Sequence, residues 1–216
     1  MRIGVIVALD GEYQQMKNLL GGRSEGRIGP NEVIVRRGGM GKVNAALTAQ
    51  KFIGDYALDC IVSTGVAGGL SGEIESLDVV AAREVVYHDV WCGEGNAYGQ
   101  VQGLPERFRT SDLLYSKAVE SGAIGGLFAS GDFFISNISE AEAILSHFPD
   151  AIAVDMESGA IAQTCYLHGV PFMGLRIISD RAGENHQEEY DNFWETVEHD
   201  SFAAVHTFLE SLPEKL

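Results

Sequence analysis

AIAVDMESGAIAQTC, residues 151–165, is the stretch from which the fold of this chain can be worked out. Its first five residues form a short apolar run that ends at Asp155, which is typical of a buried β-strand. The chain then passes directly into an expected helix over 156–168. Strands that lead into helices in this way favour an α/β fold. The stretch also raises a question of chemistry, because Asp155 and Glu157 lie among apolar and small residues.

The same alternation of short apolar runs and longer helical patterns continues on both sides of this stretch. Strands are expected at residues 2–8, 31–37, 59–64, 78–90, 123–129, 151–155 and 171–179. Helices are expected near residues 10–20, 41–56, 111–122, 138–147 and 156–168, and over most of 187–212. Buried strands that alternate with helices favour a parallel sheet with helices on both faces. We therefore predict a single three-layer α/β/α domain over residues 1–216, with a mixed, largely parallel central sheet.

The composition excludes some classes of function. Of the 216 residues, 45% are hydrophobic and 21% are charged, which are the proportions of a globular protein. The formal net charge is −16, so phosphate backbones and anionic lipids would be repelled. We therefore expect neither a nucleic-acid partner nor a membrane surface.

The cysteines and the N-terminal segment favour a cytoplasmic protein. Cys60 and Cys165 lie in separate apolar runs, and we interpret them, with Cys92, as reduced thiols. The apolar run after Arg2 has only seven residues and ends in acidic residues, unlike a signal peptide. No stretch reaches the roughly 18 apolar residues that a transmembrane helix needs.

No metal or cofactor site is expected. His88, Asp89 and Cys92 stand close together, but no second His or Cys follows at a spacing typical of zinc ligands. Ser130 has no nearby His in a triad pattern, so this serine is not expected to act as a nucleophile.

Acidic residues and glycines gather where the predicted strands end. Ligands bind outside the carboxyl ends of strands in open α/β sheets, so these segments are the best candidates for a site. Five of them converge there: Glu12, TGVAGG (64–69), SGDFFISN (130–137), DMES (155–158) and SDRAG (179–183). This convergence is a stronger signal than any single motif.

Each of these segments also has a purely structural interpretation. Glu12 would stabilise the dipole of its helix from the first turn. TGVAGG is either a tight turn or a close approach of the backbone to a ligand, and it is not a dinucleotide fingerprint because no helical pattern follows it. Ser179 could cap a helix. Phe133 and Phe134 could belong to the core or form a platform for a ligand.

Taken together, the motifs resemble the 5′-methylthioadenosine/S-adenosylhomocysteine nucleosidase family, within the purine nucleoside phosphorylase superfamily. The resemblance covers nearly the whole chain and depends on the order and spacing of the motifs. They are IGVIVALDGE (3–12), GGMGKVNAAL (38–47), STGVAGGL (63–70), YHDV (87–90), YGQ (98–100), SGDFFIS (130–136), AIAVDMESGAIA (151–162) and RIISDRA (176–182). A nucleoside phosphorylase-like fold is implied.

The resemblance implies hydrolysis of the N-glycosidic bond of 5′-substituted adenine nucleosides, with release of adenine. Positive charge develops on the ribose and negative charge on the departing purine, so the transition state needs an acid at the base and a base on the attacking water. By motif position, Asp180 is the acid at purine N7 and Ser179 orients it. Burial could raise the pKa of Asp180 enough for it to keep its proton. Glu12 is the general base, and Arg176 positions Glu12 or the water.

The same motifs supply the groups that hold the substrate. Glu157 matches the carboxylate that grips the ribose hydroxyls, and Met156 packs beside the sugar. Phe134 would stack on adenine, and the backbone of Ile135 would contact the edge of the base. Asp155 would support the turn rather than contact the ligand.

The departures from the family pattern include two positions and one segment. Val66 stands where many members have Ser, which removes one hydroxyl from the water site. Tyr190 stands near the position of a Phe that caps the purine pocket. Residues 20–38 are fewer than usual, so part of a hairpin is expected to be missing.

The resemblance also implies a homodimer in which a partner subunit closes the 5′ end of the pocket. The segments responsible would be the GGMGK loop and residues 88–105. Met40, Val90 and Trp91 would then cross the interface. Trp91 could instead belong to a local surface patch.

Other functions remain open on the same scaffold. A phosphorylase would need cations for phosphate, whereas Glu12 stands where related phosphorylases place basic residues. A futalosine-type nucleosidase would differ only in the 5′ group. A non-catalytic adenosine-binding protein would keep Phe134 and Glu157 but would not need Glu12 and Asp180.

Overall fold

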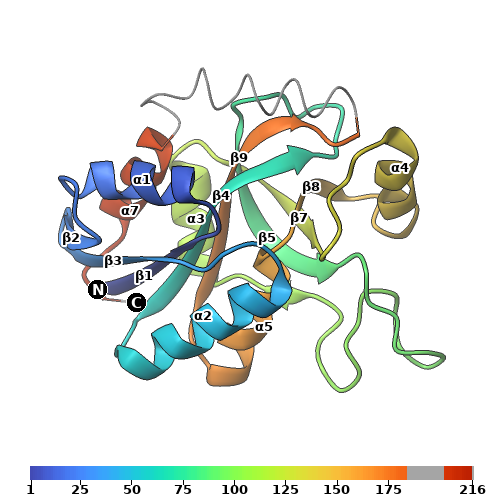
Figure 1. Ribbon diagram of the computed structural model, residues 1–216, viewed down its shortest axis with the longest axis horizontal. Coiled ribbons are helices and arrows are strands. Elements are labelled where there is room, and N and C mark those ends of the chain that lie inside the picture. Colours follow the sequence, from blue (N-terminus) through green and yellow to red (C-terminus); the bar gives the residue numbers. More distant parts are fainter. Residues whose placement is uncertain (184–201, 216) are drawn as a thin grey trace.

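The computed structural model describes residues 1–183 and 202–215, and within them nine strands form one sheet (Figure 1). These strands are β1 (Arg2–Val7), β2 (Glu25–Ile28), β3 (Asn31–Arg37), β4 (Cys60–Gly69), β5 (Val79–Tyr87), β6 (Phe108–Arg109), β7 (Ile124–Ser130), β8 (Ala151–Asp155) and β9 (Phe172–Arg181). The described helices are α1 (Asp10–Leu19), α2 (Lys42–Asp55), α3 (Asp112–Glu120), α4 (Ile138–His147), α5 (Ser158–His168) and α7 (Ala203–Ser211).

The sheet is mixed, and part of it closes into a ring. Its strands follow the order β2-β3-β1-β4-β8-β7-β5-β6, and β9 pairs with both β4 and β5. Therefore β4, β8, β7, β5 and β9 form a closed ring. Parallel pairs join β1 to β3 and β4, β4 to β9, and β7 to β5 and β8. The other pairs, β2–β3, β4–β8, β5–β6 and β5–β9, are antiparallel.

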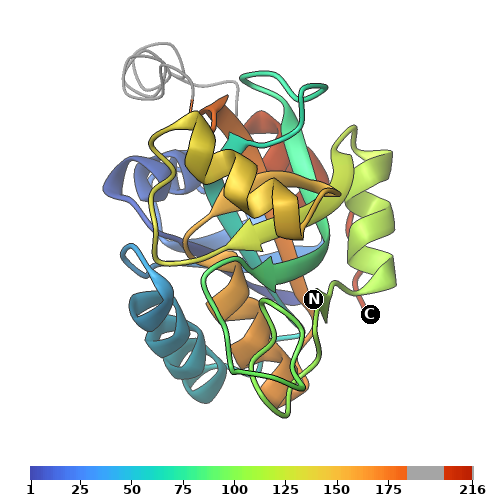
Figure 2. The same ribbon diagram turned by 90° about the vertical axis from the view of Figure 1, so that its right-hand side faces the viewer.

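Helices cover both faces of the sheet (Figures 1 and 2). On one face, Met16 of α1, Leu114 of α3 and Phe208 of α7 belong to one hydrophobic cluster. On the other, Phe52 of α2 and Ile161 of α5 belong to a second cluster. In β1, Val5 and Val7 enter the first cluster and Ile6 between them enters the second, as the pleat of a strand requires. The predicted α/β fold with its mixed sheet is confirmed.

Residues 64–69 continue β4, so the strand end expected at residue 64 is wrong. The segment pairs with β9 along its whole length, and Gly68 and Gly69 also pair with β8. Gly65 has φ 141°, and a Cβ atom there would lie 2.2 Å from Glu12 Oε1. Gly65 therefore lets a paired strand pass close to the Glu12 carboxylate, so the tight turn considered for this segment is wrong.

Three other predictions are either corrected by the described residues or tested by them only in part. Residues 25–28 and 31–34 form an antiparallel hairpin, and its shortening relative to the family stays a prediction. The helix expected from residue 156 begins at Ser158, with Glu157 as its N-cap residue, and Asp155 accepts the Ser158 N–H at 3.2 Å. Within the helix expected over 187–212, α7 lies inside the described residues and the rest lies outside them.

Candidate active site

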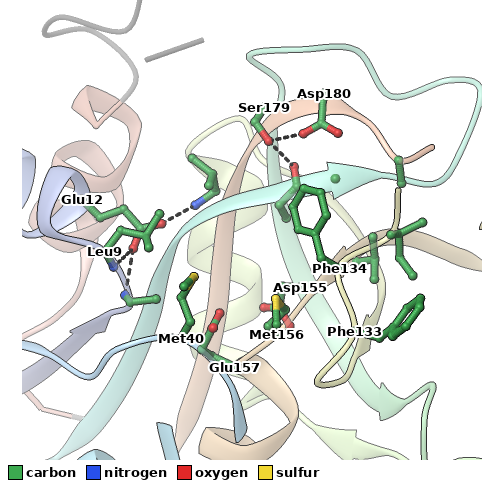
Figure 3. A pocket seen from close by; sticks show the side chains of 17 residues that line it. Leu9, Glu12, Met40, Phe133, Phe134, Asp155, Met156, Glu157, Ser179 and Asp180 are labelled. Carbon is green, nitrogen blue, oxygen red and sulfur yellow. Dashed lines mark hydrogen bonds between the residues drawn. The ribbon is translucent and has the colours of Figure 1, made fainter. Parts of the chain in front are cut away.

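A pocket opens where β1, β4, β7, β8 and β9 end, which is the edge predicted to hold a ligand (Figure 3). It encloses about 680 Å³, including space at its open side. The lining residues are Ala8, Leu9, Glu12, Met40, Val66, Ala67, Gly68, Phe133, Phe134, Ile135, Val154, Asp155, Met156, Glu157, Ser179, Asp180 and Ala182. Segments far apart in the sequence therefore meet around one space.

Glu12 is fixed by three backbone N–H groups. Its Oε2 accepts from Ala8 at 2.8 Å and from Leu9 at 2.9 Å, in the short connection between β1 and α1. Its Oε1 accepts from Val66 of β4 at 3.0 Å. Burial raises the pKa of Glu12, and these hydrogen bonds offset part of that effect. The carboxylate is thus held in one orientation while its affinity for a proton is increased.

Arg176 and Asp155 form a buried ion pair under the pocket. Arg176 Nη2 lies 2.7 Å from Asp155 Oδ2 and donates to Ser63 Oγ at 2.8 Å and Ser158 Oγ at 2.9 Å. No hydrogen bond joins Arg176 to Glu12 among the described residues, so the predicted positioning of Glu12 does not occur by direct contact. The guanidinium charge nevertheless lowers the pKa of Glu12 through space.

Glu157 lies just before α5 and faces the GGMGK loop. Its Oε1 accepts from the Gly41 N–H at 2.8 Å. Burial, followed by the charge of Asp155, raises the pKa of Glu157 to about 7. As Figure 3 shows, the side chains of Met40 and Met156 lie next to Glu157. Asp155 lies below and makes its own contacts with Arg176 and Ser158, so the two carboxylates diverge as the sequence predicts.

A second, smaller cavity lies between Glu12, Glu157 and Arg176, and Val66 borders both spaces. It has room for about one water molecule. Two carboxylates and one guanidinium therefore surround a space of the size that a single attacking water would need.

Asp180 and Ser179 lie at the end of β9, across the pocket from Glu12 (Figure 3). Ser179 Oγ is hydrogen-bonded to Asp180 Oδ1 and also lies 3.3 Å from the carbonyl oxygen of Ala67. Ser179 donates its hydroxyl proton to Asp180 Oδ1, so this serine can orient the carboxyl group as the sequence predicts.

Aromatic and aliphatic side chains form the rest of the wall. Phe133 and Phe134 both line the pocket and are half-exposed, whereas Ile135 is buried beside them. Neither phenylalanine therefore belongs to the core, and their role as a platform for a ligand stays a prediction. Phe133 was not singled out as a site residue, although its place in a polar, glycine-containing loop was the available signal.

Some expected site residues lie elsewhere. Met40 lines the pocket of its own chain, and its place at a dimer interface stays a prediction. Trp91 is exposed, stacks on Tyr98 and does not line the pocket of its own chain. Tyr190 lies outside the described residues. The small lining residues carried no signal in the sequence: Ala8, Ala67, Gly68, Val154 and Ala182.

No group of three or more His, Cys, Asp or Glu side chains in residues 1–183 and 202–215 could hold a metal ion. None of the described helices is both long and apolar enough to cross a membrane.

Comparison with known proteins agrees with this geometry. Residues 2–210 match the family model described as the phosphorylase superfamily. A 5′-methylthioadenosine/S-adenosylhomocysteine nucleosidase from Geobacillus kaustophilus is 36% identical over 200 residues, which cover 89% of this chain and 85% of the relative. The chain belongs to this nucleosidase family.

Solved structures of the nucleosidase family share the fold. The enzyme from Colwellia psychrerythraea, in complex with adenine, has a TM-score of 0.94 and 31% identity, with 100% of this chain and 97% of that one covered. The Streptococcus pneumoniae enzyme with a transition-state inhibitor has a TM-score of 0.92 and 31% identity, with 99% and 100% covered. A futalosine hydrolase mutant from Helicobacter pylori has a TM-score of 0.90 and 27% identity, with 98% and 100% covered.

Proposed function

We propose that this chain hydrolyses the N-glycosidic bond of 5′-methylthioadenosine, S-adenosylhomocysteine and similar nucleosides, and releases adenine. One observation carries the proposal: three acidic side chains from separate elements line one pocket. They are Glu12 of α1, Glu157 before α5 and Asp180 of β9. This is the charge pattern that cleavage requires, with a base for water, a polar group for the sugar and an acid for the purine.

Glu12 is the proposed general base. The smaller cavity beside it admits about one water molecule, and the Glu12 carboxylate borders that space. A raised pKa makes the carboxylate a better proton acceptor, and three N–H groups keep it in place before the reaction begins. Arg176 acts through its charge and through the Asp155 and Ser158 network.

Asp180 is the proposed general acid. Ser179 donates to Asp180 Oδ1 and orients the carboxyl group, which in its protonated form can donate to purine N7 as the glycosidic bond breaks. The substrate would be held by Glu157 at the ribose hydroxyls, by Met156 beside the sugar and by Phe134 and Ile135 at the base.

Hydrolysis is favoured over phosphorolysis by size and charge. Phosphate is several times larger than the one water molecule that the smaller cavity admits, and its anionic oxygens would face Glu12 and Glu157. Arg176 is already paired with Asp155 and would not offset both carboxylates.

A futalosine-type substrate is the second candidate. The observation that favours it is the close fold similarity to the futalosine hydrolase mutant from Helicobacter pylori. Both candidates use the same proposed acid and base, and they differ in the group at the 5′ carbon.

We also propose a homodimer and a cytoplasmic location. On α2, Val43 is 70% exposed and Leu47 one turn later is 64% exposed. Exposed apolar side chains on one helical face, beside the pocket residue Met40, are typical of an interaction surface. The buried, unpaired Cys60 and Cys165 are compatible with a reducing compartment.

The deciding experiment measures adenine release with and without phosphate. Five substrates separate the candidates: 5′-methylthioadenosine, S-adenosylhomocysteine, 5′-deoxyadenosine, adenosine and 6-amino-6-deoxyfutalosine. We expect adenine and a free sugar at a rate independent of phosphate. A sugar 1-phosphate that forms only with phosphate would replace our proposal with a phosphorylase. Binding of nucleosides without any cleavage would indicate a non-catalytic adenosine-binding protein.

A further inference from the structure

One carboxylate outside the pocket ties together two of the loops that border its open side. Both oxygens of Asp89, which follows β5, accept from Lys42 Nζ, at 2.8 and 2.7 Å. Asp89 Oδ2 also accepts from the N–H of Asp132 at 2.8 Å. The N–H of Lys42 donates to Asp132 Oδ1 at 2.6 Å, which completes a triangle. We call Lys42, Asp89 and Asp132 the latch.

The backbone next to the latch admits only glycine at two close approaches. Gly41 has φ 87°, and a Cβ atom there would lie 2.9 Å from Asp132 Oδ1. A Cβ atom on Gly131 would lie 2.8 Å from Asp89 Cγ. The side chains of Lys42 and Asp89 are only 25% and 23% exposed, so their attraction is screened less than that of a pair in open solvent.

Each loop carries groups of the pocket directly beside the latch. Next to Lys42, Gly41 donates its N–H to Glu157 at 2.8 Å. Next to Asp132, Phe133 and Phe134 line the pocket. No latch residue lines the pocket itself. The latch therefore connects the side that carries Glu157 to the side that carries the aromatic rings.

We propose that Lys42, Asp89 and Asp132 are positioning residues that set the separation between the ribose carboxylate and the aromatic platform. This inference rests on the proposed nucleosidase function. The latch does not contact Glu12, which is held by Ala8, Leu9 and Val66. Loss of the latch should therefore weaken substrate binding much more than it slows the chemical step.

The test compares Lys42→Met and Asp89→Asn with the wild-type protein in the adenine-release assay. We expect KM to rise about tenfold and kcat to change less than about threefold in both variants. In the double variant, KM should be close to that of either single variant, because both substitutions remove the same ion pair. Lys42→Arg, which can still pair with Asp89 through its planar fork, should keep KM within about threefold of wild type.

A matched control distinguishes the effect of losing the latch from the effect of removing any surface lysine. Lys117→Met removes another lysine in an ion pair, with Glu120 at 2.6 Å on α3. Its KM should equal that of the wild type. Latch variants that lose thermal stability while KM stays unchanged would overturn the inference, as would equal KM changes in latch and control variants.

A second measurement keeps the inference testable if the proposed function fails. Should the wild-type protein release no adenine from any of the nucleosides, calorimetric titration with 5′-methylthioadenosine, which would then stay intact, is done on the same variants. About tenfold weaker binding in Lys42→Met, with unchanged binding in Lys117→Met, supports the latch. Equal affinities in all variants overturn it.

Discussion

The pocket has a floor and a mouth that are built differently. The floor comprises Glu12, Asp155 and Arg176. The mouth comprises Met40, Phe133 and Phe134. Each floor residue is at most 6% exposed, whereas each mouth residue is at least 52% exposed. Every floor residue also lies in or directly beside a strand or helix, and every mouth residue lies in a loop.

The difference in burial suits the floor to the chemical step and the mouth to substrate binding. Groups that stabilise developing charge work best when they are fixed before the reaction and shielded from water. The floor meets that condition through backbone N–H groups and a buried ion pair. The mouth offers apolar surface on loops, which can fit different substituents. We therefore expect floor variants to change kcat or stability, and mouth variants to change KM.

The largest effect is expected at Glu12. Glu12→Gln keeps the size of the side chain but removes the proton acceptor, so kcat should fall by about 10²–10⁴. KM should change little, because Glu12 is proposed to contact water and not the purine. Steady-state adenine release measures both constants. A variant with wild-type kcat and a raised KM would show that Glu12 belongs functionally to the mouth.

The next effect concerns the stability of the floor. Asp155→Asn leaves the buried Arg176 charge without its carboxylate partner, and the free energy of unfolding should fall by about 3–5 kcal/mol. Denaturant unfolding measures this change. The control is Asp150→Asn, because the Asp150 side chain is 54% exposed and its pair with Arg107 should contribute less than about 1 kcal/mol. Similar losses in the two variants would contradict the described floor.

A smaller effect is expected at the mouth. Phe134→Ala removes the proposed stacking surface for adenine, which is worth about 1–3 kcal/mol, so KM should rise by about 5- to 150-fold. The change in kcat should be much smaller than in Glu12→Gln. Phe134→Tyr keeps an aromatic face and should restore most of the affinity. A kcat defect as large as that of Glu12→Gln would remove the distinction between floor and mouth.

The strand–helix alternation made most of the fold predictable. Helix α1, strand β3 and helix α4 lie where the period of apolar residues places them. The sequence places the end of β4 too early, at residue 64, because the second half of the strand is rich in glycine, which normally weakens a strand. Here β9 pairs with it throughout, and Gly65 leaves space for Glu12. Such a long-range contact has no local signature.

The site was predictable to a similar degree. The acidic residues could be located because the carboxyl ends of the strands meet at one edge of the sheet. Arg176 was placed on the correct face, but its pairing with Asp155 depends on distances that no spacing reveals. The latch could not be predicted, because Lys42, Asp89 and Asp132 come from three separate segments. The roles of the site residues and the organisation as a single domain remain predictions.

Glu157 lies between the floor residue Asp155 and the Gly41 N–H beside the mouth. The pH dependence of stability should show which of the two dominates its ionisation. Its pKa is raised from 4.5 to about 7 by burial and by Asp155. Between these values the unfolded chain releases the proton that the folded chain retains, so stability falls as the pH rises. Glu157→Gln cannot ionise and lacks this loss. The Tm of the variant relative to wild type should therefore increase between pH 5 and pH 8. The increase should be about 2–4 °C for each kcal/mol of unfolding free energy that the wild type loses. A Tm difference that stays constant across this range would mean that Glu157 is ionised throughout, with the Gly41 N–H stabilising its charge.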